Sequence, residues 1–252
     1  MLAVDISNWT GWQPQYADRL WEAGVRKVIV QVVDPPKTFP ASVFRQQIPD
    51  LIAKGFEVEA YGYLWFGYDP VAQANYWMEQ LYPWKGSISK FWVDVEDTSF
   101  DTTPEIRSEA LGKALAACNM PVGIYTAKWY WDWYMGFTEA YKDYPLWVAQ
   151  YDNVNNLDFV KFGGWVSCEI KQTVGDTQLN GVPSLDLNFY GTQLPELRTL
   201  PLDQSETVDM FRRIGSNAVA IVTDNGATAE LIVDTKYIPR KGNRAYIVEV
   251  PE

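Results

Sequence analysis

The chain of 252 residues contains no histidine, and this absence restricts its chemistry more than any other feature of the composition. Without imidazole there is no Ser-His-Asp or Cys-His catalysis, and no zinc site that uses histidine ligands. If the protein is an enzyme working near neutral pH, carboxylates are therefore the natural acid and base groups. Tyrosine, lysine and cysteine are lesser candidates.

Cysteine is scarce and positive charge is in the minority. Cys118 and Cys168 fit no metal or redox spacing, and we interpret them as buried free thiols. The formal net charge of −11 argues against nucleic acid as a partner and gives no attraction to anionic cell-wall polymers. A Gly-rich phosphate loop is also missing, and we expect neither a metal nor a cofactor.

Long apolar runs are missing as well. No run approaches the roughly 20 residues that a membrane span requires, so we expect no membrane partner. Met1 leads almost directly into an apolar strand that ends at Asp5, rather than into a signal peptide. We therefore expect a protein of the cytosol, or one exported by other means.

What the chain does contain is an alternation of apolar strands and amphipathic helices. The predicted strands cover residues 1–6, 27–33, 58–65, 88–95, 121–125, 146–150, 168–173 and 183–187, and the helices between them shrink after about residue 135. Repeated strand–helix units with buried strands predict a parallel sheet. Close to eight strands in about 190 residues indicate an α/β fold, an irregular TIM-like (β/α) barrel with its late helices reduced. A doubly wound open sheet is the alternative.

The composition changes after Leu194-Pro195, which divides the chain into a barrel (1–194), a linker (195–203) and a small β-rich C-terminal domain (204–252). In this last part we expect a short helix at 205–214, strands at 218–223, 229–234 and 244–250, and a hairpin turn at Asp224-Asn225-Gly226. It contains only three aromatic residues, so it lacks the aromatic platform of an obvious sugar-binding module.

Acidic residues lie where several of the predicted strands end. Asp5 closes the first strand, Asp94 and Glu96 close the fourth, and Asp186 lies in the last. In a parallel barrel all strand C-termini open on one face, so four acids are expected at one mouth. Such a cluster keeps one acid protonated and its neighbours ionised, as the hydrolysis of a glycosidic bond requires. The alternative for each acid alone is a capping role in a polar loop.

Aromatic residues occupy the same strand ends. They are Tyr61, Tyr63 and Trp65 in the third strand, Tyr125 in the fifth, and Trp147 and Tyr151 in and after the sixth. Rings with polar tips bind the flat C–H faces of sugars well. Core packing must nevertheless account for about half of them, because alternate strand residues point outward to the helices.

Six segments occur in an order that resembles a known family. They read AVDISNWTGW, EAYGYLWFG, FWVDVED, PVGIYTA, PLWVAQYD and EIKQTVGDTQLNGVPSLDLNFYG. Between residue 3 and about residue 191 the sequence thus resembles the family 25 glycoside hydrolases, the N-acetylmuramidase lysozymes of bacteria, fungi and phages. The resemblance implies an irregular β/α barrel that cleaves the β-1,4 bond between N-acetylmuramic acid and N-acetylglucosamine in peptidoglycan.

The resemblance also implies roles for individual residues. Glu96 would be the general acid, and Asp94 would support it or position the substrate's N-acetyl group, while Asp5 and Asp186 would hold charge and hydrogen bonds. With that role, we expect Glu96 to be protonated near neutral pH because its acidic neighbours, Asp94 first among them, oppose a further negative charge. The implied substrate-binding residues are Tyr61, Tyr63, Trp65, Tyr125, Trp147, Tyr151, Gln172 and Asn188. The expected partner is the glycan strand of bacterial peptidoglycan, with the C-terminal domain contacting the cell wall or another protein.

Some positions depart from the family pattern. Tyr61-Gly62-Tyr63 stands where the family often has a histidine, residues 33–36 replace a glycine-bearing loop, and Ile170-Lys171 stands where an aromatic commonly precedes the late glutamine. These departures keep open an alternative, a non-catalytic glycan-binding or structural (virion) module on the same barrel. A chitinase-like hydrolase fits less well, because Ser89 and Trp92 interrupt the longer acidic run of that group.

The missing signal peptide fits a phage endolysin that stays in the host cytoplasm until holin-type release, or an enzyme carried on a phage particle. In either case we expect it to act at the bacterial cell wall.

Overall fold

A computed structural model describes residues 1–32 and 43–191, together with three short strands nearer the C-terminus. The chain divides into two compact units, Met1–Gly191 and Thr192–Glu252. The predicted linker, the helix at 205–214, the turn at 224–226 and the loop at 33–36 lie outside the described residues.

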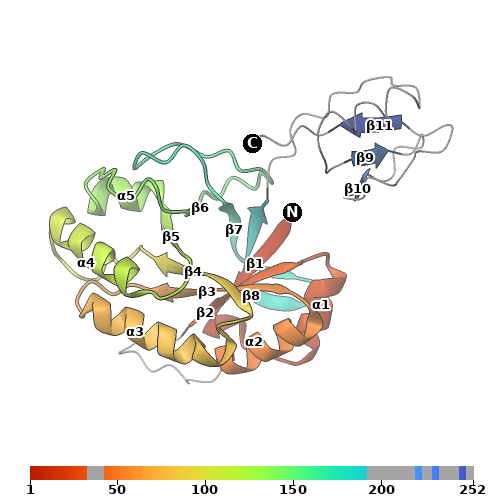
Figure 1. The fold of residues 1–252 in the computed structure, drawn as a ribbon, viewed down its shortest axis with the longest axis horizontal. Helices are drawn as coiled ribbons and strands as arrows, with labels where there is room; N and C mark the ends of the chain where they lie inside the picture. The colour runs from red at the N-terminus through yellow and green to blue at the C-terminus, as the bar shows by residue number, and fades with distance from the viewer. Residues whose placement is uncertain (33–42, 192–218, 223–228, 233–243, 248–252) are drawn as a thin grey trace. The chain divides into compact units, whose positions relative to one another are not determined.

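Eight strands of the first unit close into a barrel (Figure 1). They are β1 (Leu2–Ile6), β2 (Lys27–Gln31), β3 (Glu57–Tyr63), β4 (Ile88–Asp94), β5 (Val122–Ala127), β6 (Leu146–Ala149), β7 (Ile170–Leu179) and β8 (Val182–Tyr190). The predicted TIM-like barrel is confirmed. The prediction of an entirely parallel sheet is wrong for the last strand, since β8 runs antiparallel to both β7 and β1.

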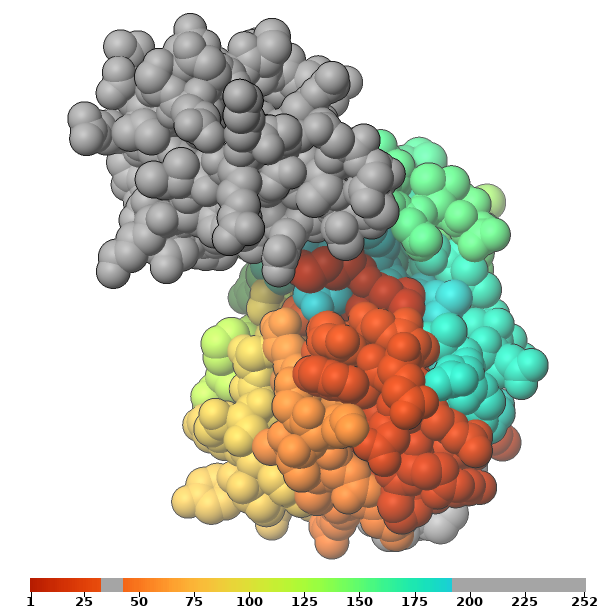
Figure 2. Space-filling model, turned by 90° about the vertical axis from the view of Figure 1, so that its right-hand side faces the viewer, coloured from red at the N-terminus to blue at the C-terminus, as the bar shows by residue number. Residues whose placement is uncertain are grey.

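The direction of β8 follows from the connection that precedes it. Only Asn180 and Gly181 separate β7 from β8, and both have positive φ, +48° and +74°. Two residues make a tight hairpin of the type that Asn-Gly favours, whereas a parallel strand needs a crossover of a dozen residues or more. Because β8 also pairs with β1, residues near the N-terminus lie beside those of the last strands on the barrel surface (Figure 2).

Helices cover the strands only in the first part of the barrel. They are α1 (Gln15–Glu22), α2 (Val43–Lys54), α3 (Pro70–Leu81), α4 (Pro104–Ala117) and α5 (Lys128–Tyr134), with 3₁₀ turns η1 (Asn8–Thr10) and η2 (Tyr82–Trp84). Helices α3 and α4 begin at Pro70 and Pro104, and the side chains of Asp69 and Thr103 cap them just before these prolines. Pro49 lies inside α2, which continues through it. Residues 135–191 are all described and contain no helix, as the reduction of late helices predicts.

Two apolar clusters fill the unit. The larger lies between the barrel wall and the helices, where Leu20, Phe44, Leu51, Trp77 and Leu111 are fully or almost fully buried. The smaller fills the barrel interior with Ala3, Ile29, Tyr61, Trp92, Tyr125, Trp147, Ile170 and Tyr190. Gly62 of β3 faces the outer cluster, where a Cβ would lie 2.5 Å from the indole of Trp77. Tyr61 therefore faces the interior while its neighbour allows α3 to approach the strand.

In the second unit, β9 (Val219–Val222), β10 (Ala229–Ile232) and β11 (Arg244–Ile247) form an antiparallel sheet in the order β10-β9-β11. These strands fall within the three predicted runs. Among the described residues, no helix is long and apolar enough to cross a membrane.

Candidate active site

The predicted acids come together at the mouth of the barrel. Asp5 in β1 and Asp186 in β8 are direct partners in the antiparallel register. Asp94 is the last residue of β4, and Glu96 follows two residues later. The negative charges of Glu96, Asp94 and Asp5 all act on the buried hydroxyl of Tyr125, whose pKa lies well above its ordinary value, through burial first and these charges next. The four acids thus share one site, although Asp186 reaches it from within an antiparallel strand rather than from a strand's C-terminal end.

Two side-chain amides hold the acids of β1 and β8. The Nε2 group of Gln172 donates to Oδ1 of Asp5 at 2.9 Å and to Oδ2 of Asp186 at 3.0 Å. Asn188 donates to the same Asp5 oxygen at 2.7 Å, and the backbone N–H of Asp176 donates to Asp186 at 2.6 Å. Each carboxyl group is therefore fixed in position by at least two donors.

Aromatic side chains fix the amides in turn. The hydroxyls of Tyr125 and Tyr151 donate to Oε1 of Gln172 at 2.8 and 2.9 Å, and the indole of Trp147 donates to Oδ1 of Asn188 at 2.8 Å. Because both amide oxygens accept, both NH₂ groups must face the acids. Trp147 and Asn188 are almost completely buried, so they act on the site through Asp5.

The remaining predicted aromatics differ in exposure. Tyr61 is buried and packs edge-on against Trp147, with ring centroids 5.8 Å apart. Tyr63 and Trp65 are half-buried and in ring contact. The sequence prediction places Trp65 within the third strand, but β3 ends at Tyr63 and Trp65 follows it. Tyr151 is 64% exposed. A direct substrate contact thus remains a prediction, best supported for Tyr63, Trp65 and Tyr151.

Burial and mutual repulsion raise the pKa values of the acids. Burial, followed by the charge of Asp186, raises the pKa of Glu96 to about 7. Burial and Asp186 also raise the pKa of Asp5 to about 8, against the lowering effect of the two amide donors. Burial raises the pKa of Asp186 too, but a backbone donor opposes this. The raised pKa of Glu96 has the direction that the sequence predicts, but the neighbouring charge that raises it is that of Asp186, where the sequence prediction names Asp94 first.

The chain on both sides of Glu96 is held by hydrogen bonds. Thr126 donates to the carbonyl of Val95 at 2.8 Å, and Arg107 and Tyr130 donate to the carbonyl of Asp97 at 2.6 and 2.8 Å. The carboxylate of Asp97 accepts from the N–H of Phe66 at 3.0 Å and from Ser99. Arg107 is not among the predicted site residues. Its one sequence signal is its place on the buried stripe of α4, four residues before Leu111.

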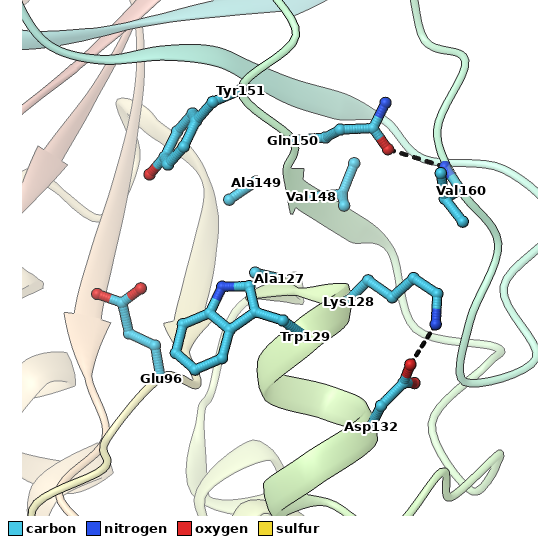
Figure 3. A pocket seen from close by; sticks show the side chains of 10 residues that line it. All are labelled: Glu96, Ala127, Lys128, Trp129, Asp132, Val148, Ala149, Gln150, Tyr151 and Val160. Carbon is cyan, nitrogen blue, oxygen red and sulfur yellow. Dashed lines mark hydrogen bonds and ion pairs between the residues drawn. The ribbon is translucent and has the colours of Figure 1, made fainter.

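Two pockets open beside the acids, and Tyr151 lines both. One, of about 570 Å³, is lined by Glu96, Ala127, Lys128, Trp129, Asp132, Val148, Ala149, Gln150, Tyr151 and Val160 (Figure 3). The other, of about 830 Å³, is lined by Tyr151, Asn153, Thr173, Val174, Gly175, Asp176, Thr177, Asp186 and Leu187. Both volumes fall in the range of small-molecule sites, and together the pockets give Glu96 and Asp186 access to a ligand.

Other reactive groups do not contribute. Cys118 and Cys168 are free thiols, and burial raises their pKa values to about 12 and 11, so both stay protonated. In the part of the chain that the structure describes, no three acidic or cysteine side chains are grouped so that they could hold a metal ion.

Comparison with known proteins gives a consistent family. The sequence model described as "Glycosyl hydrolases family 25" matches residues 4–175. Among curated proteins, Counting factor 50 of Dictyostelium discoideum is 32% identical over 114 residues, covering 42% of this chain and 37% of that protein. Probable GH family 25 lysozyme 5 of the same organism is 33% identical over 106 residues, covering 39% of this chain and 49% of that protein. The chain thus spans half or less of the length of these two relatives.

Solved structures share the fold at lower identity. A muramidase from Acremonium alcalophilum has a TM-score of 0.63 at 19% identity, covering 77% of this chain and 94% of that one. The catalytic domain of endolysin ply40 from bacteriophage P40 of Listeria monocytogenes has a TM-score of 0.60 at 16% identity, covering 76% of this chain and 93% of that one.

Proposed function

The chain belongs to the glycosyl hydrolases of family 25, and we propose that it is a lysozyme acting on bacterial peptidoglycan. The bond that it cleaves is the β-1,4 bond between N-acetylmuramic acid and N-acetylglucosamine. The observation that carries the proposal is the coupled carboxyl cluster, in which Glu96 has a pKa of about 7 and Asp186 lies close enough to raise it. A curated relative of this chain is named "Probable GH family 25 lysozyme 5", which supports the lysozyme activity.

The reaction needs one proton donor and one negative group. Glu96 gives its proton to the glycosidic oxygen while the bond from that oxygen to C1 of the muramic acid breaks, and the bonding electrons leave with the oxygen. Positive charge develops on C1, where the ionised carboxylate of Asp186 stabilises it. Water then adds to C1 and gives up a proton to the Glu96 carboxylate, which returns the acid to its starting state.

The other two acids have supporting roles in this proposal. Burial raises the pKa of Asp5 to about 8, above that of Glu96, so at neutral pH Asp5 is mostly protonated and leaves the negative charge on Asp186. Asp94 is buried at the end of β4, beside Glu96, and positions either this acid or the N-acetyl group of the substrate. The enzyme acts at the cell wall because its substrate is there.

The test compares wild-type protein with Glu96→Gln on purified peptidoglycan. Release of reducing ends is expected to fall by about 10² to 10⁴ in the variant, since glutamine cannot donate the proton. Reduction with borohydride and mass spectrometry should find the new ends on muramic acid. Glu22→Gln, at an exposed position of α1, is the matched control and should keep full activity.

Two results would count against the proposal. New reducing ends on N-acetylglucosamine would show that a different bond is cleaved. Glycan binding by the wild type without any release over long incubation would favour the non-catalytic glycan-binding module instead.

A further inference from the structure

The pocket beside Glu96 contains an aromatic side chain that the catalytic cluster does not use. Trp129 lies in the first turn of α5, and its indole is 55% exposed. In Figure 3 this indole lies between the carboxylate of Glu96 and the ion pair of Lys128 with Asp132, all of which line the same pocket. A flat apolar surface therefore begins directly beside the proton donor.

The packing of α5 explains why Trp129 remains accessible. Tyr130 and Trp131 are completely buried and attach the helix to the barrel. The indole of Trp131 donates to the carbonyl of Thr138 at 2.9 Å. Trp129 and Trp133 lie on the opposite side of the helix and are exposed, but only Trp129 lines the pocket. An exposed indole on a helix that is anchored by its other aromatics can meet a ligand at little entropic cost.

Most polar groups around this pocket already have partners. The amide of Gln150 donates to Asp152 at 2.7 Å and accepts from the N–H of Val160 at 2.8 Å. The hydroxyl of Tyr151 is engaged by Gln172. Lys128 and Asp132 neutralise each other's charge, but retain further hydrogen-bonding capacity at the far end of the pocket. The walls thus suit an uncharged ligand with one apolar face and polar edges.

The two pockets differ in charge, and this difference orients a glycan. The second pocket, which Tyr151 also lines, contains Asp186 and Asp176 without a basic residue in its lining. The sugar ring that becomes positively charged at C1 is stabilised by negative charge, so it belongs on the Asp186 side. The sugar that leaves carries the protonated oxygen, so it belongs on the side where Glu96 lines an otherwise neutral pocket.

We propose that Trp129 is the stacking platform of the leaving-sugar subsite, which binds the N-acetylglucosamine ring released by the reaction. The C–H face of the ring lies on the indole, its oxygen 4 faces Glu96, and its polar edge reaches the Lys128–Asp132 pair. This inference rests on the proposed lysozyme function and adds a specificity residue to it.

The experiment compares Trp129→Ala with Trp133→Ala on soluble glycan strands freed of peptide. Trp133 is the matched control, because it is an exposed tryptophan of the same helix outside the pocket lining. Trp129→Ala should raise KM roughly tenfold and weaken inhibition by the N-acetylglucosamine disaccharide by a similar factor, with a smaller change in kcat. Trp129→Phe should restore part of the binding, and Trp133→Ala should match the wild type in all three constants.

Equal KM and equal inhibition for the two alanine variants would overturn the subsite. If the wild type releases no reducing ends, the lysozyme function has failed, and the subsite is then decided by calorimetric binding of the disaccharide alone. Binding that is lost in Trp129→Ala and kept in Trp133→Ala would still support a sugar platform. Binding that is absent, or equal in both variants, would reject it.

Discussion

From β1 to α5 each strand of the barrel is followed by a helix, whereas from β6 to β8 the connections are a loop and a hairpin. The first region supplies Asp94 and Glu96 just where parallel strands end. The second supplies Asp186, Gln172 and Asn188 from within two antiparallel strands. The proposed proton donor and the carboxylate that raises its pKa therefore come from regions built in different ways.

The difference shows how a site can be completed without regular βα units. An antiparallel strand places Asp186 directly opposite Asp5, at the cost of two acids in contact. The amides of the same region offset that cost by donating to both carboxyl groups. In the first region, side chains of α4 and α5, Arg107 and Tyr130, donate to the backbone carbonyl of Asp97 and so hold the chain beside Glu96.

After Glu96→Gln, the largest effect on activity is expected for Asp186→Asn. This substitution removes the charge of the second region that acts on Glu96 in the first. Loss of the stabilising charge should lower kcat/KM by about 10²-fold to 10³-fold. Activity requires protonated Glu96, so it should decline above a pH of about 7 in the wild type. Because the charge of Asp186 helps to raise the pKa of Glu96, the declining limb should move to lower pH in this variant.

Asp94→Asn is the comparison for that pH profile. The charge of Asp186 raises the pKa of Glu96, so Asp94→Asn should move the declining limb less than Asp186→Asn does, even if kcat falls. An unchanged limb in Asp186→Asn, measured as log kcat/KM against pH, would contradict the coupling.

A smaller effect is expected in the region without helices, where a buried lysine organises the loop. Lys171 is completely buried and donates to Asp152 at 2.9 Å, Asn156 at 3.0 Å and the carbonyl of Asp158 at 2.9 Å. Lys171→Met removes these bonds and should lower Tm by about 5–10 °C, since breaking a buried pair costs about 3 kcal/mol. Hydrogen exchange at the N–H of Val160 should also become faster.

Lys113→Met is the control for the buried lysine. Lys113 forms an exposed ion pair with Glu109 on α4, and its loss should change Tm by about 1 °C or less. Equal effects of the two substitutions on thermal unfolding would show that the loop does not depend on Lys171.

The smallest effect is expected for Asp5→Asn, and it should be a gain in stability. The folded-state pKa of Asp5 is about 8, against about 4 in an unfolded chain. The folded state therefore loses stability as the pH rises between these values, and asparagine removes that loss. Tm should equal that of the wild type near pH 4, and the gain should grow as the pH rises, to its largest value above pH 8. A gain of the same size at pH 4 would point to packing instead of titration.

Particular residues show how far the sequence leads. Asp5, Asp94, Glu96 and Asp186 could be predicted as one cluster, because strand ends converge in a closed barrel and no histidine competes with them. The antiparallel direction of β8 could also be predicted, since Asn180-Gly181 is a strong hairpin signal between two strand-like runs. It is easily missed where repeated βα units lead one to expect another parallel strand.

Other features could not be read from the sequence. Nothing in the spacing of residues shows that Trp147 donates to Asn188, or that Arg107 binds the carbonyl that follows Glu96. Trp129, Trp131 and Trp133 occur in one short aromatic segment, and only packing separates the buried one from the two exposed ones. Such contacts join residues far apart along the chain, so local patterns carry little information about them.

By itself, the sequence determined the barrel, the loss of its late helices and the identity of the acids. These properties follow from apolar periodicity and from residue type, which are local. Only the tertiary structure decided which acid opposes the ionisation of Glu96, because electrostatic repulsion depends on distance and burial rather than on sequence separation. Asp94 is the near neighbour along the chain, but Asp186, ninety residues later, is the one whose charge raises the pKa of Glu96.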